Sequence, residues 1–339
     1  MKILMIGGTG NISMSITRLL SDKGNEVVLL NRGNHPVSLP HVRSLTADIR
    51  DEAGTRTALG DETFDAVADF ICFTPDQAET DIRLFSGRTR QFIFISSASA
   101  YRKPLGHVMI SESTPLHNPY WLYSRNKQAC EELFMKAWRE NGFPITIVRP
   151  SHTFSDSTLP VPIHGNKGPW QIVRRMLDHK PVPVCGDGES LWAVLSSDEF
   201  ARAFVGLLGH IGAIGEAVHI TGEELLTWNQ ILRTTALAFG GTYIPCYVPS
   251  SLLARTRLYD YTGAMIGDKS NSVMFDTRKL HRLNPAYHQE ETFHQAIART
   301  AAHYRRDPDI MTLDPAFDAF CDKLCVLMEE TGKAIEALT

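Results

Sequence analysis

The sequence predicts an α/β fold, in which a parallel sheet with helices on both faces is joined to a smaller C-terminal α/β lobe. Over the first 150 residues, short apolar runs alternate with helical patterns. Beyond them, proline and glycine become frequent and the spacing of the elements becomes irregular. A chain of 339 residues is also long enough for two joined lobes. We therefore expect a sheet domain at 1–150, a lobe at 151–310 that is partly interleaved with it, and a helical tail at 311–339.

Six apolar segments are expected to form the strands of the parallel sheet. They are Lys2–Ile6, Glu26–Leu30, Val42–Thr46, Ala66–Phe70, Gln91–Ser96 and Ile145–Arg149. The helical patterns between them cover Ile12–Lys23, Pro75–Phe85 and Tyr120–Glu140. Short apolar runs are typical of strands that are buried on both faces, and Gly24 and Gly142 provide the stop signals expected after two of the helices.

The tail from Pro315 to Leu338 carries apolar side chains at near-helical spacing, which predicts an amphipathic helix. This helix would dock on the body of the protein or on a second copy, so a homodimer stays open. Cys321 and Cys325 lie one helical turn apart in it, and no further cysteine or histidine lies nearby in the sequence. We therefore expect two buried thiols rather than zinc ligands, and no metal site.

Composition and charge exclude several classes of protein. The formal net charge is −4 and the isoelectric point is near 6.4, so the chain offers no basic field for nucleic acid. The mean hydropathy is −0.14, and no apolar run approaches the roughly 20 residues that cross a bilayer. The apolar start Met1–Gly7 is too short for a signal peptide, and six scattered cysteines are typical of a reducing compartment. These features favour a cytoplasmic protein that binds a small molecule rather than nucleic acid or a membrane.

A glycine-rich turn follows the first expected strand. The run Gly7-Gly8-Thr9-Gly10-Asn11-Ile12 stands between that strand and the body of the first helix. Glycine lacks the Cβ atom that would block a tight turn and the close approach of a pyrophosphate, and the start of the helix offers free N–H groups to the same phosphate. Ser13 stands where a third glycine is common, and it is small enough for the helix to lie close to the strand. The turn therefore predicts a Rossmann-type, doubly wound sheet that binds a dinucleotide through this run.

Residues at the ends of the second and third expected strands would contact the adenosine part of such a dinucleotide. An acidic residue at the end of the second strand would bind a ribose diol and repel a 2′-phosphate, but the chain has Asn31 and Arg32 there. Arg32 could pair with a 2′-phosphate or stack on the adenine, or it could be a solvated loop residue. The expected cofactor is therefore NAD(P), with a slight preference for NADP. Asp48 follows the third strand, where it would bind the adenine amino group or form an ordinary turn.

A serine, a tyrosine and a lysine further along the chain form the candidate catalytic set. Ser97 follows the fifth expected strand, and Tyr123 and Lys127 lie four residues apart on one face of the third expected helix. A phenol with an ordinary pKa of about 10 is a poor base at neutral pH. A nearby ammonium group and a positively charged nicotinamide ring would both lower the pKa of Tyr123. Ser97 would donate a hydrogen bond to the substrate oxygen that Tyr123 deprotonates, and Lys127 would also hold the nicotinamide ribose.

Taken together, these motifs resemble the short-chain dehydrogenase/reductase superfamily. More narrowly, the chain is similar to its extended and atypical branch, the NAD-dependent epimerase/dehydratase family, which includes the UDP-galactose 4-epimerases. The resemblance covers roughly residues 1–305. The motifs that carry it are Gly7–Ser13, Ala47–Ile49, the set Ser97, Tyr123 and Lys127, Val148–His152, and Gly186–Gly188 leading to Asp198.

The resemblance implies further contacts with the cofactor. Asp48 and Ile49 would bind the adenine, and the segment that begins Phe70-Ile71-Cys72 would border the cofactor. Lys127 would hold the ribose. Pro150 to His152 would close over the nicotinamide and the diphosphate of a substrate.

Side chains from several segments are expected to bind the substrate. They are Ser97, Ser99, His152, Trp192 and Lys269. Trp192 could stack on a base or a sugar face, or it could pack in the core. Lys269 is one of several cations that could meet a diphosphate, although it could instead be an ordinary surface charge.

Two departures from the family pattern concern the reaction. Sugar-nucleotide 4,6-dehydratases resemble one another in carrying Thr-Asp-Glu where this chain has Ser97-Ala98-Ser99, so the acid and base that expel water are missing. After Gly186–Gly188 many relatives carry an arginine that holds nucleotide phosphate, whereas this chain continues with Glu189–Trp192. Dehydration is therefore disfavoured, and a nucleotide-sugar substrate is less well supported than the cofactor.

The expected activity is reversible hydride transfer at a secondary alcohol, with a nucleotide sugar as the favoured substrate and epimerisation as the favoured reaction. An NADP-dependent reductase or dehydrogenase of a small carbonyl compound would use the same residues and is the main alternative. A non-enzymatic scaffold that senses a dinucleotide or associates with RNA is a further alternative. Such relatives tend to lose the tyrosine or the lysine, and this chain keeps Tyr123 and Lys127.

Overall fold

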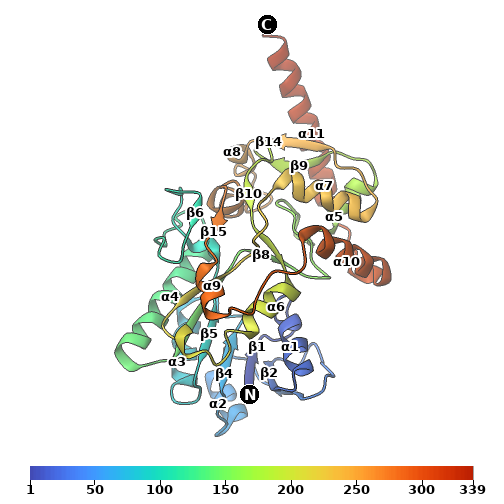
Figure 1. Cartoon of the computed structure of the whole chain (residues 1–339). Coiled ribbons are helices and arrows are strands. Elements are labelled where there is room, and N and C mark those ends of the chain that lie inside the picture. Colours follow the sequence, from blue (N-terminus) through green and yellow to red (C-terminus); the bar gives the residue numbers. More distant parts are fainter. Residues whose placement is uncertain (339) are drawn as a thin grey trace.

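Seven parallel strands form the central sheet of the protein. The computed structural model describes residues 1–338, and its sheet has the strand order β12-β7-β5-β4-β1-β2-β3. Figure 1 labels β5, β4, β1 and β2 of this sheet. All neighbouring strands in it are parallel. The strands are β1 (Lys2–Ile6), β2 (Glu26–Asn31), β3 (Val42–Thr46), β4 (Ala66–Asp69), β5 (Phe92–Ile95), β7 (Ile145–Pro150) and β12 (Ala217–Ile220). Because the chain runs outward from β1 to β3 and then returns to β4, the order reverses beside β1, as in a doubly wound Rossmann-type sheet. The predicted fold class is confirmed.

Helices cover both faces of this sheet, because side chains alternate along each buried strand. Ile3 and Met5 of β1 cluster with apolar side chains of α1 and α6, whereas Leu4 and Ile6 cluster with those of α3 and α4. The helices are α1 (Ser13–Asp22) and α6 (Ser197–Val205) on the first face, and α2 (Glu52–Leu59), α3 (Pro75–Phe85) and α4 (Leu122–Asn141) on the second. Burial on both faces explains the apolar runs in the sequence.

The predicted elements of the sheet agree with the structure to within two residues at either end. All six expected strands are observed, and helix α3 has the predicted bounds. The sequence does not predict α2, because this helix is short and buries only Thr55 and Leu59. It begins after Asp51, whose side chain accepts a hydrogen bond from the N–H of Gly54 at 3.0 Å.

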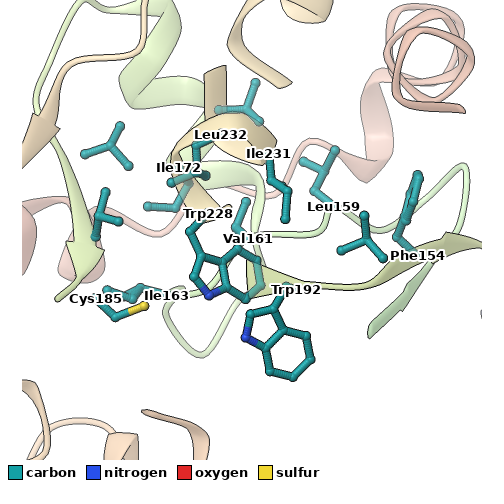
Figure 2. Packing of buried hydrophobic residues seen from close by; sticks show 14 of the residues in the cluster. Phe154, Leu159, Val161, Ile163, Ile172, Cys185, Trp192, Trp228, Ile231 and Leu232 are labelled. Atoms are coloured by element: carbon teal, nitrogen blue, oxygen red, sulfur yellow. The ribbon is translucent and has the colours of Figure 1, made fainter. Parts of the chain in front are cut away.

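Residues beyond β7 build the smaller lobe and also return to the sheet as β12. The remaining strands are β6 (Met109–Ile110), β8 (His152–Phe154), β9 (Val182–Cys185), β10 (Leu191–Trp192), β11 (Val194–Ser196), β13 (Leu226–Thr227), β14 (Pro245–Val248) and β15 (Met274–Phe275). The remaining helices are α5 (Trp170–Leu177), α7 (Trp228–Phe239), α8 (Ser250–Leu253), α9 (Arg278–Leu283), α10 (Phe293–Arg306) and α11 (Pro315–Glu336), with short helical turns η1 (Ala98–Ala100), η2 (Ile211–Ala213) and η4 (Pro308–Ile310) and a π-helical segment η3 (Thr262–Lys269). Figure 2 shows the core of the lobe, where Trp192 and Trp228 lie side by side.

The tail forms the predicted helix α11, and its first half docks on the body. Phe317 and Cys321 are buried against β9, β14 and α5. Arg175 of α5 donates hydrogen bonds to Asp318 and Asp322 at 2.6 and 2.8 Å. Cys321 is fully buried, whereas Cys325 is only half-buried. The second half of α11 projects from the lobe (Figure 1), and no helix within residues 1–338 combines the length and apolar character needed to span a bilayer.

A buried polar network ties the carboxyl ends of β5, β7 and β12 together. Arg149 of β7 pairs with Glu131 of α4 at 2.5 Å and donates to the hydroxyl of Tyr101 at 2.8 Å. Ser96 donates to the same carboxylate, and the ring of His219 on β12 meets Tyr101. All five side chains are almost fully buried, so water screens the charges little and each group depends on its partner. The network therefore fixes the strand ends at which the cavities described below are built.

Replacing Arg149 by methionine should lower the free energy of unfolding by about 3–5 kcal/mol, because Glu131 would keep a buried charge without its partner. Chemical denaturation followed by circular dichroism measures the change. The matched control is Arg139→Met on the exposed side of α4, which should change the stability by less than about 0.5 kcal/mol. An Arg149→Met protein as stable as the unmodified chain would show that this ion pair does not hold the strand ends.

Candidate active site

The glycine-rich turn after β1 forms a narrow cradle. Gly7 has a φ of 74°, and a Cβ atom there would lie 2.6 Å from the side chain of Ile71. A Cβ atom at Gly8 would lie 2.6 Å from a leucine methyl group. The Oγ of Ser13 donates to the carbonyl of Gly7 at 2.7 Å and accepts from the N–H of Gly10 at 2.9 Å. The serine that replaces a third glycine therefore fastens the turn, and α1 begins directly behind it.

Two adjoining cavities run from this cradle along the carboxyl ends of the strands. The first has a volume of about 310 Å³ and lies over the ends of β2 and β3, and the second has about 250 Å³ and reaches α4. They share Gly7, Gly10, Ile71 and Phe73, so together they form one extended groove. The predicted cofactor residues that line this groove are Gly7, Thr9, Gly10, Asn11, Ile12, Asn31, Arg32, Asp48, Ile49, Phe70, Ile71, Tyr123, Lys127 and Pro150. Those that do not are Gly8 and Cys72, which are buried, and His152, which lines a further cavity.

The first cavity has a cationic wall near the end of β2. Arg32 and Arg50 line it, and neither guanidinium group makes a hydrogen bond or an ion pair within residues 1–338. The side-chain oxygen of Asn31 accepts from the N–H of Gly33 at 2.8 Å, whereas its amide nitrogen is buried without a partner. Asp48 accepts from the N–H of Arg50 at 3.1 Å. This end of the groove therefore offers two guanidinium groups and one amide N–H to a ligand.

Tyr123 and Lys127 lie on the first two turns of α4, and Lys127 is almost fully buried. Its ammonium group donates to the carbonyl oxygens of Cys72 at 2.6 Å and Ile95 at 2.7 Å. The same group lies 4.6 Å from the ring centroid of Phe73 and 5.8 Å from that of Tyr123. Lys127 therefore joins α4 to the ends of two strands and fixes the phenol one helical turn away.

Burial raises the pKa of Tyr123, and a hydrogen bond with the side chain of Ser97 acts in the opposite direction. Burial likewise lowers the pKa of Lys127. The lowering of the phenol pKa that we expect from a neighbouring lysine is therefore not found in the protein alone. The physical reason is the burial of the phenol. The ammonium group, which we expect to oppose this effect, donates to two carbonyl oxygens instead.

Tyr123 also borders a further cavity of about 240 Å³, which we call the third cavity. All the residues predicted for the substrate line it, namely Ser97, Ser99, His152, Trp192 and Lys269. The Oγ atoms of Ser97 and Ser99 lie 2.9 Å apart, and Ser124 donates to Ser99 at 2.8 Å. The hydroxyl of Ser97 is therefore supported from behind while it faces the cavity beside Tyr123.

His152 and Trp192 form one wall of the third cavity. The ring of His152 stands edge-on to Trp192 and Trp228, with centroids 6.5 and 6.1 Å away. Trp192 is only 3% exposed and its indole N–H donates to the carbonyl of Lys269 at 3.0 Å, so most of its surface packs in the core. Burial, reinforced by the charge of Lys269, lowers the pKa of His152 to about 3. His152 is therefore neutral at physiological pH.

Asp268 and Trp121 line the third cavity, and the sequence does not predict either of them as a site residue. Trp121 stands two positions before Tyr123, which is a signal that could have been used. Asp268 lies in no motif. Its only signal is that Asp268 and Lys269 end a segment that is otherwise uncharged from Thr262 onward.

Comparison with known proteins identifies the family. The sequence model of the NAD dependent epimerase/dehydratase family matches residues 3–220, a span that includes the cradle, Ser97, Tyr123 and Lys127. The chain belongs to this family. The resemblance seen in the sequence is therefore confirmed.

Relatives within the family carry different names and activities. The chain is 26% identical over 294 residues to the 2′-dehydrokanamycin reductase of Streptomyces kanamyceticus, which covers 85% of this chain and 80% of that protein. It is 26% identical over 255 residues to the chloroplast stem-loop binding protein of 41 kDa b of Arabidopsis thaliana, which covers 70% of this chain and 63% of that protein. The crystal structure of the UDP-glucose 4-epimerase of Bifidobacterium longum in complex with NAD+ and UDP matches with a TM-score of 0.72 at 19% identity, over 91% of this chain and 99% of the other. These likenesses establish a common fold for proteins of several activities.

The stability of the protein should depend on the ionisation of His152. The pKa of this group is about 3 in the folded protein and 6.5 in its ordinary state, so the unfolded chain takes up the proton first as the pH falls. The contribution of neutral His152 to the free energy of unfolding is therefore complete above about pH 6.5. This contribution is lost as the pH falls toward about 3. His152→Gln should flatten the pH dependence of the free energy of unfolding in that window, measured by denaturation at several pH values. The exposed His294→Gln is the matched control, and a His152 ring that titrates near pH 6.5 by NMR would contradict the expectation.

Proposed function

We propose that the protein is an NAD(P)-dependent enzyme that transfers a hydride at a secondary alcohol carbon of a sugar or a related hydroxy compound. The observation that carries this proposal is the meeting of Ser97, Tyr123 and Lys127 where the groove adjoins the third cavity. Tyr123 lines both spaces. A dinucleotide in the groove and a substrate in the third cavity would therefore meet beside its phenol.

The residues of the groove fit a nicotinamide dinucleotide. The cradle at Gly7 leaves no room for a Cβ atom and lies before the N-terminus of α1, which suits a pyrophosphate. Asp48 and Ile49 line the end where an adenine would lie, and Lys127 lines the opposite end. When bound, such a cofactor accepts or supplies the hydride.

The chain's own residues would then handle the proton and the substrate oxygen. Tyr123 takes the hydroxyl proton during oxidation and returns a proton to the oxygen during reduction. Ser97, supported by Ser99, donates a hydrogen bond to the same oxygen. Lys127 holds the cofactor ribose and keeps α4 in place. Acid–base catalysis of this kind typically accelerates a reaction by about 10²–10⁴-fold.

Between the two reactions open to this site, we favour reduction of a sugar carbonyl. The match to the 2′-dehydrokanamycin reductase over 85% of the chain supports this choice. The second candidate is a nucleotide-sugar epimerase, which the similarity to the UDP-glucose 4-epimerase fold supports.

A nucleic-acid-binding role, which the name of the Arabidopsis relative suggests, is less well supported. The net charge of −4 provides no basic field. The contact between Tyr123 and Ser97 and the buried position of Lys127 also favour an enzyme.

Replacing Tyr123 by phenylalanine should lower kcat by about 10²–10⁴-fold while leaving the Kd of NADPH nearly unchanged, because the proton donor is lost and the ring remains. NADPH oxidation with a panel of sugar ketones gives kcat, and fluorescence titration gives the Kd. Tyr120→Phe, at a tyrosine that is 42% exposed before α4, is the control. Equal turnover by the Tyr123→Phe protein would contradict the proposed role.

The same assay separates the two candidate reactions. A reductase consumes added NADPH in step with product, and its purified protein releases no stoichiometric nucleotide on denaturation. An epimerase keeps its cofactor and interconverts two sugars without consuming NADPH. This outcome would contradict the reductase and support the nucleotide-sugar epimerase.

The unpaired guanidinium group of Arg32 should favour a 2′-phosphate. Replacing Arg32 by glutamine should therefore weaken NADPH binding by about tenfold and leave NADH binding nearly unchanged, because one charge-assisted hydrogen bond is lost. Competition titrations with both cofactors measure the ratio. Arg18→Gln, on the exposed side of α1, is the matched control. An equal loss for both cofactors would assign Arg32 to a role other than 2′-phosphate recognition.

A further inference from the structure

We propose that the substrate carries a single carboxylate, as a sugar acid does, and that Lys269 binds this carboxylate at one end of the third cavity while Asp268 accepts a hydrogen bond from a neighbouring hydroxyl. The inference rests on the proposed function, since it names the substrate class of the same site. It concerns a segment, η3, that lies outside the region matched by the family model.

Two charged side chains, Asp268 and Lys269, line this end of the third cavity. A third, Lys103, does not line it but is buried where it interacts with the charge of Asp268. Within residues 1–338, the carboxylate and the two ammonium groups make no hydrogen bond and no ion pair. None of their charged atoms is a fully buried atom without a partner, so water can reach them. A ligand with an anionic group and a hydroxyl would replace this water at Lys269 and Asp268.

The backbone of Lys269 is fixed by the core of the lobe. Its carbonyl oxygen accepts hydrogen bonds from the indole N–H groups of Trp192 at 3.0 Å and Trp228 at 2.9 Å. The two indoles lie side by side, with ring centroids 5.5 Å apart (Figure 2). Because both donors belong to well-packed side chains, the backbone of Lys269 is held at a fixed point on the cavity wall. The ammonium group extends from this point and is free to pair with an anion.

The wall of the cavity favours one negative charge on the ligand. Lys269 offers one ammonium group there and Asp268 one carboxylate, while His152 is neutral because burial lowers its pKa. Burial lowers the pKa of Lys269, so a ligand carboxylate that pairs with this lysine would also stabilise its charged form. A phosphate ester carries about −1.5 to −2 charges at neutral pH and would be repelled more strongly by Asp268. The site therefore favours a carboxylate over a phosphate.

The position of Asp268 suits a polyhydroxy compound. Asp268 and Tyr123 line the same cavity, so a hydroxyl that Asp268 binds would lie near the reacting hydroxyl. Trp121 lines the same cavity and its ring lies 5.0 Å from that of Tyr123, which provides an aromatic wall for a sugar face. The cavity volume of about 240 Å³ agrees with one sugar ring.

Binding of matched sugar pairs to the protein loaded with NADPH tests this proposal without relying on turnover. The probes are glucuronate against glucose and galacturonate against galactose, with glucose 6-phosphate as the phosphate comparison, all measured by titration calorimetry. Each uronate should bind about tenfold more tightly than its neutral partner, because a charge-assisted hydrogen bond is gained. Lys269→Gln should abolish this preference. Lys167→Gln, which removes an exposed lysine of the same lobe, should retain it.

Two further variants separate charge from shape. Lys269→Arg should keep the preference for the uronates, and Asp268→Asn should raise the affinity for glucose 6-phosphate relative to glucuronate, since one repulsive charge is removed. Equal binding of uronates and neutral sugars would overturn the proposal, as would tighter binding of glucose 6-phosphate than of glucuronate to the unmodified protein. A uronate preference that survives Lys269→Gln would overturn it as well. The protein could also reduce neutral sugars with NADPH in a reaction that requires Tyr123, yet show no preference for uronates. That result would contradict this inference and leave the proposed function intact.

Discussion

The buried ammonium group of Lys127 is the interaction on which the rest of the site depends. Carbonyl oxygens of the loop after β4 and of β5 are left free where the strands end, and Lys127 binds one of each. Helix α4, which carries Tyr123 one turn earlier, is thereby tied to the sheet at the level of the groove. The Arg149–Glu131 pair anchors the same helix further along its length. The geometry of the site is thus set by polar groups in the interior, which tolerate fewer alternative arrangements than apolar packing does.

Some polar groups at the cavities of this site have no partner in the protein. The amide nitrogen of Asn31 is buried without one, and the guanidinium of Arg32 and the carboxylate of Asp268 border cavities unpaired. The charged groups of the network around Arg149, by contrast, are satisfied by one another. A ligand in the cavities would complete the groups at their walls.

Local patterns in the sequence predict the sheet and the cradle well, because buried strands and glycine turns are encoded by neighbouring residues. Helix α2 escapes prediction, since it depends on a cap at Asp51 and on tertiary burial of two side chains. The sequence leaves two roles open for Trp192, namely stacking on a ligand and packing in the core. The choice between them depends on a hydrogen bond from its indole to the carbonyl of Lys269, a residue that is remote in the sequence. The same holds for Asp268, which reaches the third cavity through the path of the chain rather than through any motif. The pKa of Tyr123 depends chiefly on the burial of its phenol, which spacing alone does not determine.

The segment η3 couples the third cavity to the core of the lobe. Its residues Asp268 and Lys269 face the third cavity, and no residue of Thr262–Lys269 lines the two cavities of the groove. The same segment is packed inside the lobe, because a Cβ atom at Gly263 would lie 2.2 Å from Trp121 and Met265 is fully buried. An engineer who wishes to alter the third cavity alone would therefore exchange the side chain of Lys269 and leave the glycine and the methionine in place. An exchange of Asp268 would reach further, because its charge acts on the pKa of Tyr123.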